Sequence, residues 1–231
     1  MLSQWHVATI GVANLDVALA FWIDLVGYNI VSTSSGGDCG LGRQWSLPAE
    51  AFKRQALIGY SENLNGRLHL IEMNTPGVPV RSGSSVYDAC LKNIDIYVSD
   101  IESRIVILRN AGYTTRTDFH SDIIAADGTR FREMHMAIHD GINLVLLELP
   151  DVSMSINSKG FGAIGPLISV VPKIDVEKRF YREVLGLEML TDNFFEGDDI
   201  ERMIGLPAGA GLDVSIWGRP GQWSAQLELV Q

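Results

Sequence analysis

The sequence predicts an α+β protein built from three copies of one module, each with a single helix and about four strands. Three observations predict this class. A β-rich run followed by apolar residues at helical spacing recurs three times along the 231 residues. A glycine follows each predicted helix, at the position where a left-handed residue commonly ends it. Each copy then closes with a short apolar or alternating strand that carries a glutamate.

The first copy shows the pattern most fully. Apolar residues recur at helical spacing between Leu15 and Val26, and the aromatic pair Phe21-Trp22 lies within this stretch. The third copy repeats the pattern with Phe180-Tyr181, whereas the second copy is shorter and less aromatic. The predicted helix caps and terminal glycines are Asn14 and Gly27, Asp100 and Gly112, and Asp175 and Gly186.

The closing strands and the connections between copies set the module boundaries. Strands are predicted at 67–73, 142–149 and 224–230, and they contain Glu72, Glu148 and Glu228 respectively. Segments rich in turn residues, 74–85 and 150–162, separate the copies. We therefore predict modules at residues 1–78, 86–150 and 160–231, called modules 1, 2 and 3 below.

Composition and charge exclude several classes of function. With 46% hydrophobic and 20% charged residues, the chain is of the ordinary globular type. Its net charge of −10 disfavours nucleic acid as a partner, and no apolar run is long enough to cross a membrane. The first six residues lack a secretory signal pattern, so a cytoplasmic location is expected. The two cysteines cannot build a thiolate zinc site or a disulfide framework.

The repeated pattern of strand, Val-x-Asp/Asn, aromatic-rich helix and Leu/Val-Gly resembles the module of the vicinal oxygen chelate superfamily. That superfamily includes glyoxalase I, bleomycin-resistance proteins and extradiol dioxygenases. The resemblance implies βαβββ modules that pair into curved mixed sheets around a cavity for a small organic molecule. It implies that module 1 pairs with module 2, and that the partner of module 3 is either missing from this chain or supplied by a second subunit in a homodimer.

The resemblance also implies positions for a divalent metal such as Fe, Mn, Ni or Zn. One ligand lies on the first strand, five residues before the Val of Val-x-Asp, and a glutamate lies near the end of the last strand. The first-strand positions hold Val7, Asn93 and Pro166, of which only Asn93 offers an oxygen. His6 is one residue away from its expected position and therefore points to the opposite strand face unless a bulge intervenes.

The closing glutamates are the principal candidates for chemistry. A carboxylate on the same strand face as Leu68 and Leu70 is costly to bury without a cation or a hydrogen-bond donor. We therefore predict Glu72 and Glu148 as catalytic residues and, together with His6, as metal ligands. The alternative interpretation is that these glutamates accept hydrogen bonds, that no metal is bound and that His6 is a surface residue.

Four further residues are predicted to contact a substrate. Trp45 and Arg43 follow the glycine-rich stretch 34–42, which resembles a cavity lid, and Arg43 suits an anionic group. Asn93 occupies a first-strand position. His135 shares a strand face with Glu133, as an acid–base pair or as a structural contact.

Three functions remain open at this point. The first is an enzyme of lyase, isomerase or dioxygenase type, with Glu72 or Glu148 taking a proton next to a carbonyl. The second is a non-catalytic protein that sequesters a hydrophobic or aromatic compound. In the third, modules 1 and 2 are an inactive half, and the chemistry belongs to module 3 and an absent fourth module.

Overall fold

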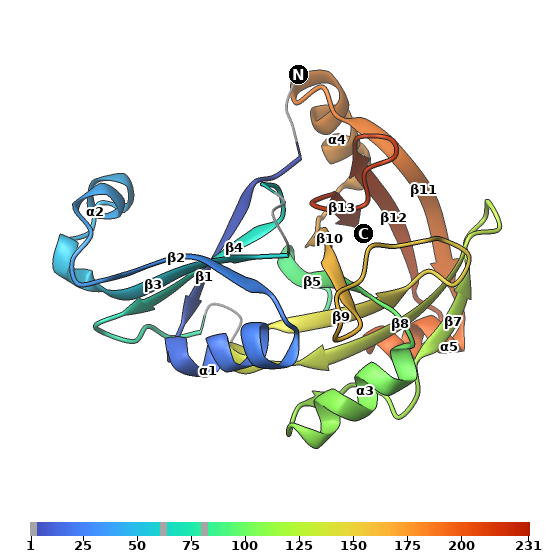
Figure 1. Cartoon of the computed structure of the whole chain (residues 1–231). Coiled ribbons are helices and arrows are strands. Elements are labelled where there is room, and N and C mark those ends of the chain that lie inside the picture. The colour runs from blue at the N-terminus through green and yellow to red at the C-terminus, as the bar shows by residue number, and fades with distance from the viewer. Residues whose placement is uncertain (1–3, 61–63, 80–82) are drawn as a thin grey trace.

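Two curved sheets make up the computed structural model, which describes residues 4–60, 64–79 and 83–231 (Figure 1). The smaller sheet has the strand order β1-β4-β3-β2. The larger sheet has nine strands in the order β11-β12-β13-β10-β5-β9-β8-β6, and β7 also pairs with β8. Residues 80–82 of the predicted connection 74–85 lie outside the described residues.

The smaller sheet belongs to the first module. Its glycine-rich stretch, predicted as a loop, instead forms a short helix that Asp38 caps through the backbone N–H groups of Gly40 and Leu41. In chain order the elements are β1 (Val7–Val12), α1 (Leu15–Leu19), the π-helical continuation η1 (Ala20–Leu25), β2 (Asn29–Ser35), α2 (Cys39–Trp45), η2 (Ala49–Ala51), β3 (Phe52–Gly59) and β4 (Arg67–Met73).

The larger sheet contains the strands that follow residue 86. None of the helices in the described ranges has the length and apolar character needed to span a bilayer. The first half of the larger sheet is formed, in chain order with its helices, by β5 (Cys90–Val98), α3 (Ile101–Asn110), β6 (Thr114–Thr115), β7 (Ser121–Ile124), β8 (Arg130–Ala137), η3 (His139–Gly141) and β9 (Asn143–Glu148). Its second half comprises β10 (Phe161–Val170), α4 (Ile174–Arg179), η4 (Phe180–Val184), β11 (Glu188–Glu196), α5 (Asp198–Ile204), β12 (Gly211–Gly218) and β13 (Leu227–Val230).

The predicted helix ends are confirmed with one exception. Asn14 and Asp100 accept hydrogen bonds from backbone N–H groups in the first turns of α1 and α3. The three predicted glycines, Gly27, Gly112 and Gly186, have φ of 84°, 94° and 65°. Asp175 is not a cap, because it lies inside α4, whose first N–H group, that of Ile174, donates to the Gln231 side chain at 2.7 Å.

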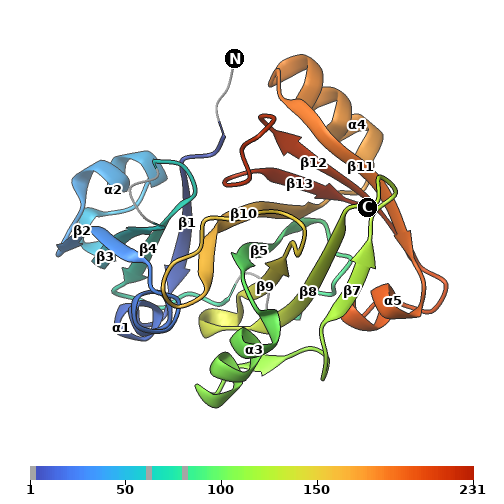
Figure 2. The ribbon, with the colours of Figure 1, turned by 45° about the vertical axis from the view of Figure 1, so that its right-hand side comes forward.

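The expected pairing of modules 1 and 2 is wrong. Strand β5 of module 2 pairs antiparallel with β10 of module 3, with Ile96 opposite Ile164 and Asn93 opposite Ile168. Modules 2 and 3 therefore form one continuous sheet that curves into a cup, and module 3 has its partner within the chain (Figure 2). The first strands of all three modules carry similar β-type residues, so strand composition did not indicate which two edges would meet.

Module 1 packs against the outside of this cup. Its helix and the inner residues of its sheet share a single hydrophobic core with α3, β5, β8 and β9. Trp22 is fully buried there and donates its indole N–H to His139 Nε2 at 2.9 Å. The Tyr28 hydroxyl likewise donates to the Gly162 carbonyl at 2.9 Å. The opposite face of module 1 is open, since every residue of β2 is exposed.

Candidate functional site

A cavity of about 800 Å³ lies inside the cup formed by modules 2 and 3. This volume falls in the range of pockets that hold small organic ligands. Side chains alternate along each strand, so every second residue of β5 and β13 faces the cavity. On β5 these are Asn93, Asp95 and Tyr97, and on β13 they are Glu228 and Val230; Gln226, just before β13, also lines the cavity.

Two carboxyl groups line this cavity: that of Asp95, which is buried, and that of Glu228, which is half-buried. Burial, and then the negative charge of Glu133, raises the pKa of Glu228 to about 8. Burial, followed by the charges of Glu228 and Glu133, also raises the pKa of Asp95 well above its usual value. Asp95 accepts a hydrogen bond from the Asn93 amide at 3.1 Å. Glu228 is therefore placed to hold a proton at neutral pH and to exchange it with a ligand.

A second polar group on the cavity wall is the chain of Glu133, His135 and Asn143. The Asn143 side-chain amide donates to His135 Nδ1 at 3.0 Å, and His135 Nε2 lies 2.8 Å from the Glu133 carboxylate. With Nδ1 acting as acceptor, Nε2 carries the proton that is donated to Glu133. Both predicted members of this pair line the cavity, and His135 is nearly buried.

Apolar and aromatic side chains cover most of the remaining wall. Phe131 and Phe195 meet edge to face with ring centroids 5.9 Å apart, and Tyr97 and Trp223 do so at 6.4 Å. All four rings line the cavity. Such walls suit a ligand that combines an apolar body with one polar group.

The structure brings only two of the predicted site residues, Asn93 and His135, to this cavity. Trp45 and Arg43 lie on α2 of module 1, where the Trp45 ring packs against Phe52 with centroids 5.7 Å apart. His6 is an exposed residue just before β1. None of the predicted metal ligands Glu72, Glu148 and His6 is among the residues that line the cavity.

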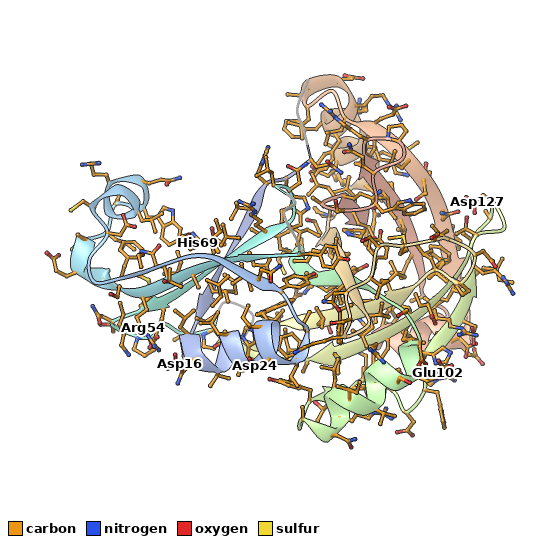
Figure 3. The ribbon with its side chains drawn as sticks, in the orientation of Figure 1. Asp16, Asp24, Arg54, His69, Glu102 and Asp127 are labelled. Carbon is orange, nitrogen blue, oxygen red and sulfur yellow. The ribbon has the colours of Figure 1, made fainter. Side chains whose placement is uncertain are left out.

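Glu72 instead stabilises the start of the first helix. Its carboxylate accepts hydrogen bonds from Lys53 Nζ at 2.7 Å, from Arg54 Nε at 2.8 Å and from the Leu15 backbone N–H at 3.3 Å. The Lys53 bond is the largest of the contributions that lower the pKa of Glu72 to about 2. Figure 3 shows Arg54 and Asp16 on the side of the sheet that carries α1, with His69 on the other side. The carboxylate thus has the cation and donors that its burial requires, supplied by the protein itself.

Glu148 and Gln231 occupy the corresponding position in the other modules. The Asp100 N–H donates to Glu148 at 2.7 Å, just as the Leu15 N–H donates to Glu72 and the Ile174 N–H to Gln231. Each of these side chains is a helix-start acceptor on the face opposite the cavity. Glu228 lies three residues before Gln231, and an odd shift along a strand moves a side chain to the other face.

The donor set of the cavity does not fit a divalent metal. In the described ranges, no group of three or more His, Cys, Asp or Glu side chains is arranged to hold a metal ion. Of the first-strand positions in the cup, Asn93 offers an amide that bonds Asp95, and Pro166 offers no ligand. The last-strand position equivalent to Glu228 in module 2, three residues before Glu148, is Val145. At the four positions that the resemblance implies, one carboxylate and one amide are too few ligands for these ions.

Comparisons with known proteins identify similar folds among solved structures. Glyoxalase I from Zea mays matches with a TM-score of 0.65 at 15% sequence identity, over 99% of this chain and 67% of its own. A candidate dioxygenase from Bacillus subtilis matches with a TM-score of 0.61 at 12% identity, over 99% of this chain and 64% of its own. A glyoxalase family protein from Bacillus cereus matches with a TM-score of 0.53 at 19% identity, over 64% of this chain and 94% of its own.

The sequence comparisons give a different result. No protein-family model matches this chain, and no curated protein sequence does. The chain spans about two thirds of the length of the Zea mays and Bacillus subtilis proteins. At these identities the likeness concerns the fold, and the chemistry has to be argued from the cavity.

Proposed function

We propose that this chain, which has the fold of the vicinal oxygen chelate superfamily, binds a small organic molecule between modules 2 and 3 and transfers a proton on it. The observation that carries the proposal is Glu228, a half-buried carboxyl with a pKa of about 8 on the wall of an 800 Å³ cavity. A general acid or base works best when its pKa lies near the working pH. In this proposal Glu228 takes the catalytic role first predicted for Glu72 and Glu148.

The proposed step is removal of a proton from a carbon next to a carbonyl, as in isomerase- or lyase-type chemistry. The Glu228 carboxylate accepts the proton, the electron pair of the broken C–H bond moves toward the carbonyl oxygen, and the proton returns to carbon in the product. Asp95 and the Glu133–His135 pair are placed to hold polar groups of the ligand. A divalent metal has no part in this proposal, because the donor set does not fit one.

Deuterium exchange tests the proposal. In D₂O, the protein is incubated with a panel of small ketones and aldehydes, and proton NMR follows loss of the C–H signal next to the carbonyl. We expect exchange that the variant Glu228→Gln slows by about 10²–10⁴-fold, the usual contribution of general acid–base catalysis. Glu183→Gln, at an exposed position on η4, is the control with the same substitution.

The same experiment distinguishes an enzyme from a non-catalytic sequestering protein. The mostly apolar cavity wall favours this second function as well. A sequestering protein gives line broadening of the bound compounds, equal in both variants, without deuterium incorporation. Exchange that is as fast in Glu228→Gln as in the unaltered protein would exclude Glu228 as the group that moves the proton.

The homodimer is also part of the proposal, now through module 1. In the described ranges, β1 pairs only with β4, and Val7 on this edge strand is 44% exposed. The first strands of modules 2 and 3 cover each other, so a second copy of module 1 fits this edge in the same way. Light scattering is expected to give twice the mass of one chain. A monomer at micromolar concentration would contradict this assembly.

A further inference from the structure

The wall of the cavity carries more acid than base. Its two basic side chains are already held by backbone carbonyls, since Lys92 Nζ donates to the Ser85 carbonyl at 2.5 Å and the Arg116 guanidinium donates to that of Ile204. Five acidic side chains line the same wall, namely Asp95, Asp127, Glu133, Glu188 and Glu228.

The Glu228 carboxyl is the least satisfied of these groups. It is half-buried, faces the cavity and accepts no hydrogen bond from the residues that the structure describes. The charged and titratable groups that line the same cavity are Lys92, Asp95, Tyr97, Arg116, Asp127, Glu133, His135 and Glu188. Asp95 has a single donor, the Asn93 amide. A carboxyl that is partly withdrawn from water and has no donor is costly to ionise, so the part of the cavity beside Glu228 suits a group that brings positive charge or a proton.

The size and the walls of the cavity indicate what kind of cation fits. A volume of about 800 Å³ is far larger than a bare ion needs, and the described residues do not form a metal cluster. The ring pairs Phe131–Phe195 and Tyr97–Trp223 also line this cavity. Aromatic faces attract organic cations, and they also cover an apolar body.

We propose that the cavity selects organic cations, with an ammonium-type group seated beside Glu228 and Asp95 and an apolar body against the aromatic walls. This inference rests on the proposed function, because it names the substrate class of the same site. The bound positive charge favours the ionised form of Glu228, so a cationic substrate also converts this carboxyl into the base that the proton transfer needs.

A matched pair of probes tests this selection. Phenyltrimethylammonium carries its charge at every pH, and tert-butylbenzene has the same shape without the charge. Competition binding at pH 7 is expected to give a dissociation constant about tenfold or more lower for the cation. At pH 9 we expect the cation to bind more tightly still, because Glu228 is then ionised, while binding of the neutral probe stays the same.

Two variants locate the effect. Glu228→Gln is expected to reduce the preference for the cation to less than about threefold, and Asp95→Asn to weaken it. Glu183→Gln, with the same change in net charge at an exposed position, is expected to keep the full preference. Thermal melts of each variant establish that it is folded.

The outcomes separate this inference from the proposed function. If tert-butylbenzene binds as tightly as the cation, or if Glu228→Gln keeps the preference, the selection of cations is wrong while binding of small organic molecules stands. If neither probe binds up to its solubility limit, the inference is wrong and the cavity also loses its support as a binding site.

Discussion

Replacing Trp22 by alanine is expected to lower the free energy of unfolding by about 3–5 kcal/mol. The indole is fully buried in the core that joins module 1 to the outside of the cup. Its ring meets Phe21 edge to face with centroids 5.0 Å apart. Its N–H donates to His139 Nε2, while His139 Nδ1 lies 2.7 Å from Asp140. The substitution therefore leaves a cavity and also removes the donor to a buried imidazole.

Urea denaturation followed by circular dichroism measures this loss. Trp22→Phe keeps an aromatic ring but removes the N–H, so it is expected to cost about 1–3 kcal/mol. Trp45→Ala is the control for removing a tryptophan, since that ring is 39% exposed on α2 and its loss is expected to cost less than a fully buried ring does. A loss of less than about 1 kcal/mol for Trp22→Ala would contradict the tight packing of the two parts.

Replacing Glu228 by glutamine is expected to make the protein more stable in alkaline solution. The pKa of Glu228 is about 8 in the folded protein, against the ordinary glutamate value of 4.5. Between these two pH values the folded chain keeps a proton that the unfolded chain has lost. The free energy of unfolding of the unaltered protein therefore falls as pH rises from about 4.5 to about 8. Glutamine carries no charge and avoids this loss.

At pH 9 the variant Glu228→Gln is expected to exceed the unaltered protein in stability by on the order of 2 kcal/mol or more, with little difference at pH 4. Chemical denaturation at a series of pH values checks this. Glu183→Gln, whose carboxyl is exposed, is expected to show no such dependence. A gap between Glu228→Gln and the unaltered protein that is equal at pH 4 and pH 9 would mean that the Glu228 pKa is not raised.

Much of the fold follows from local sequence signals. Gly27, Gly112 and Gly186 mark the helix ends because each has a positive φ that glycine adopts cheaply. Asn14 and Asp100 are caps for an equally local reason, the hydrogen bonds they accept from the first turn. The pairing of modules is not local. It depends on which strand edges meet, and three similar first strands leave that choice to the tertiary structure.

The site was predicted less well, and the reason is one of register. Glu72, Glu148 and Glu228 look alike in sequence, yet β1 places Val12 opposite Glu72, whereas β10 places Ile168 opposite Glu228 and Val170 opposite Val230. The true counterpart of Glu72 is Gln231, which also receives the first helical N–H. The expectation that a buried glutamate needs a cation is satisfied in Glu72 by Lys53 and Arg54.

The strand position of Glu228 is filled differently in each module. Three residues before the helix-start acceptor stand His69 in module 1, Val145 in module 2 and Glu228 in module 3. The two halves of the cup are thus copies in backbone but not in chemistry, with a carboxyl on the β13 side and an aliphatic residue on the β9 side. A molecule bound in the cup would therefore meet a carboxyl on one side and an aliphatic side chain on the other, and it would bind in a single orientation. A symmetric ligand would gain nothing from the repeated backbone of the two halves.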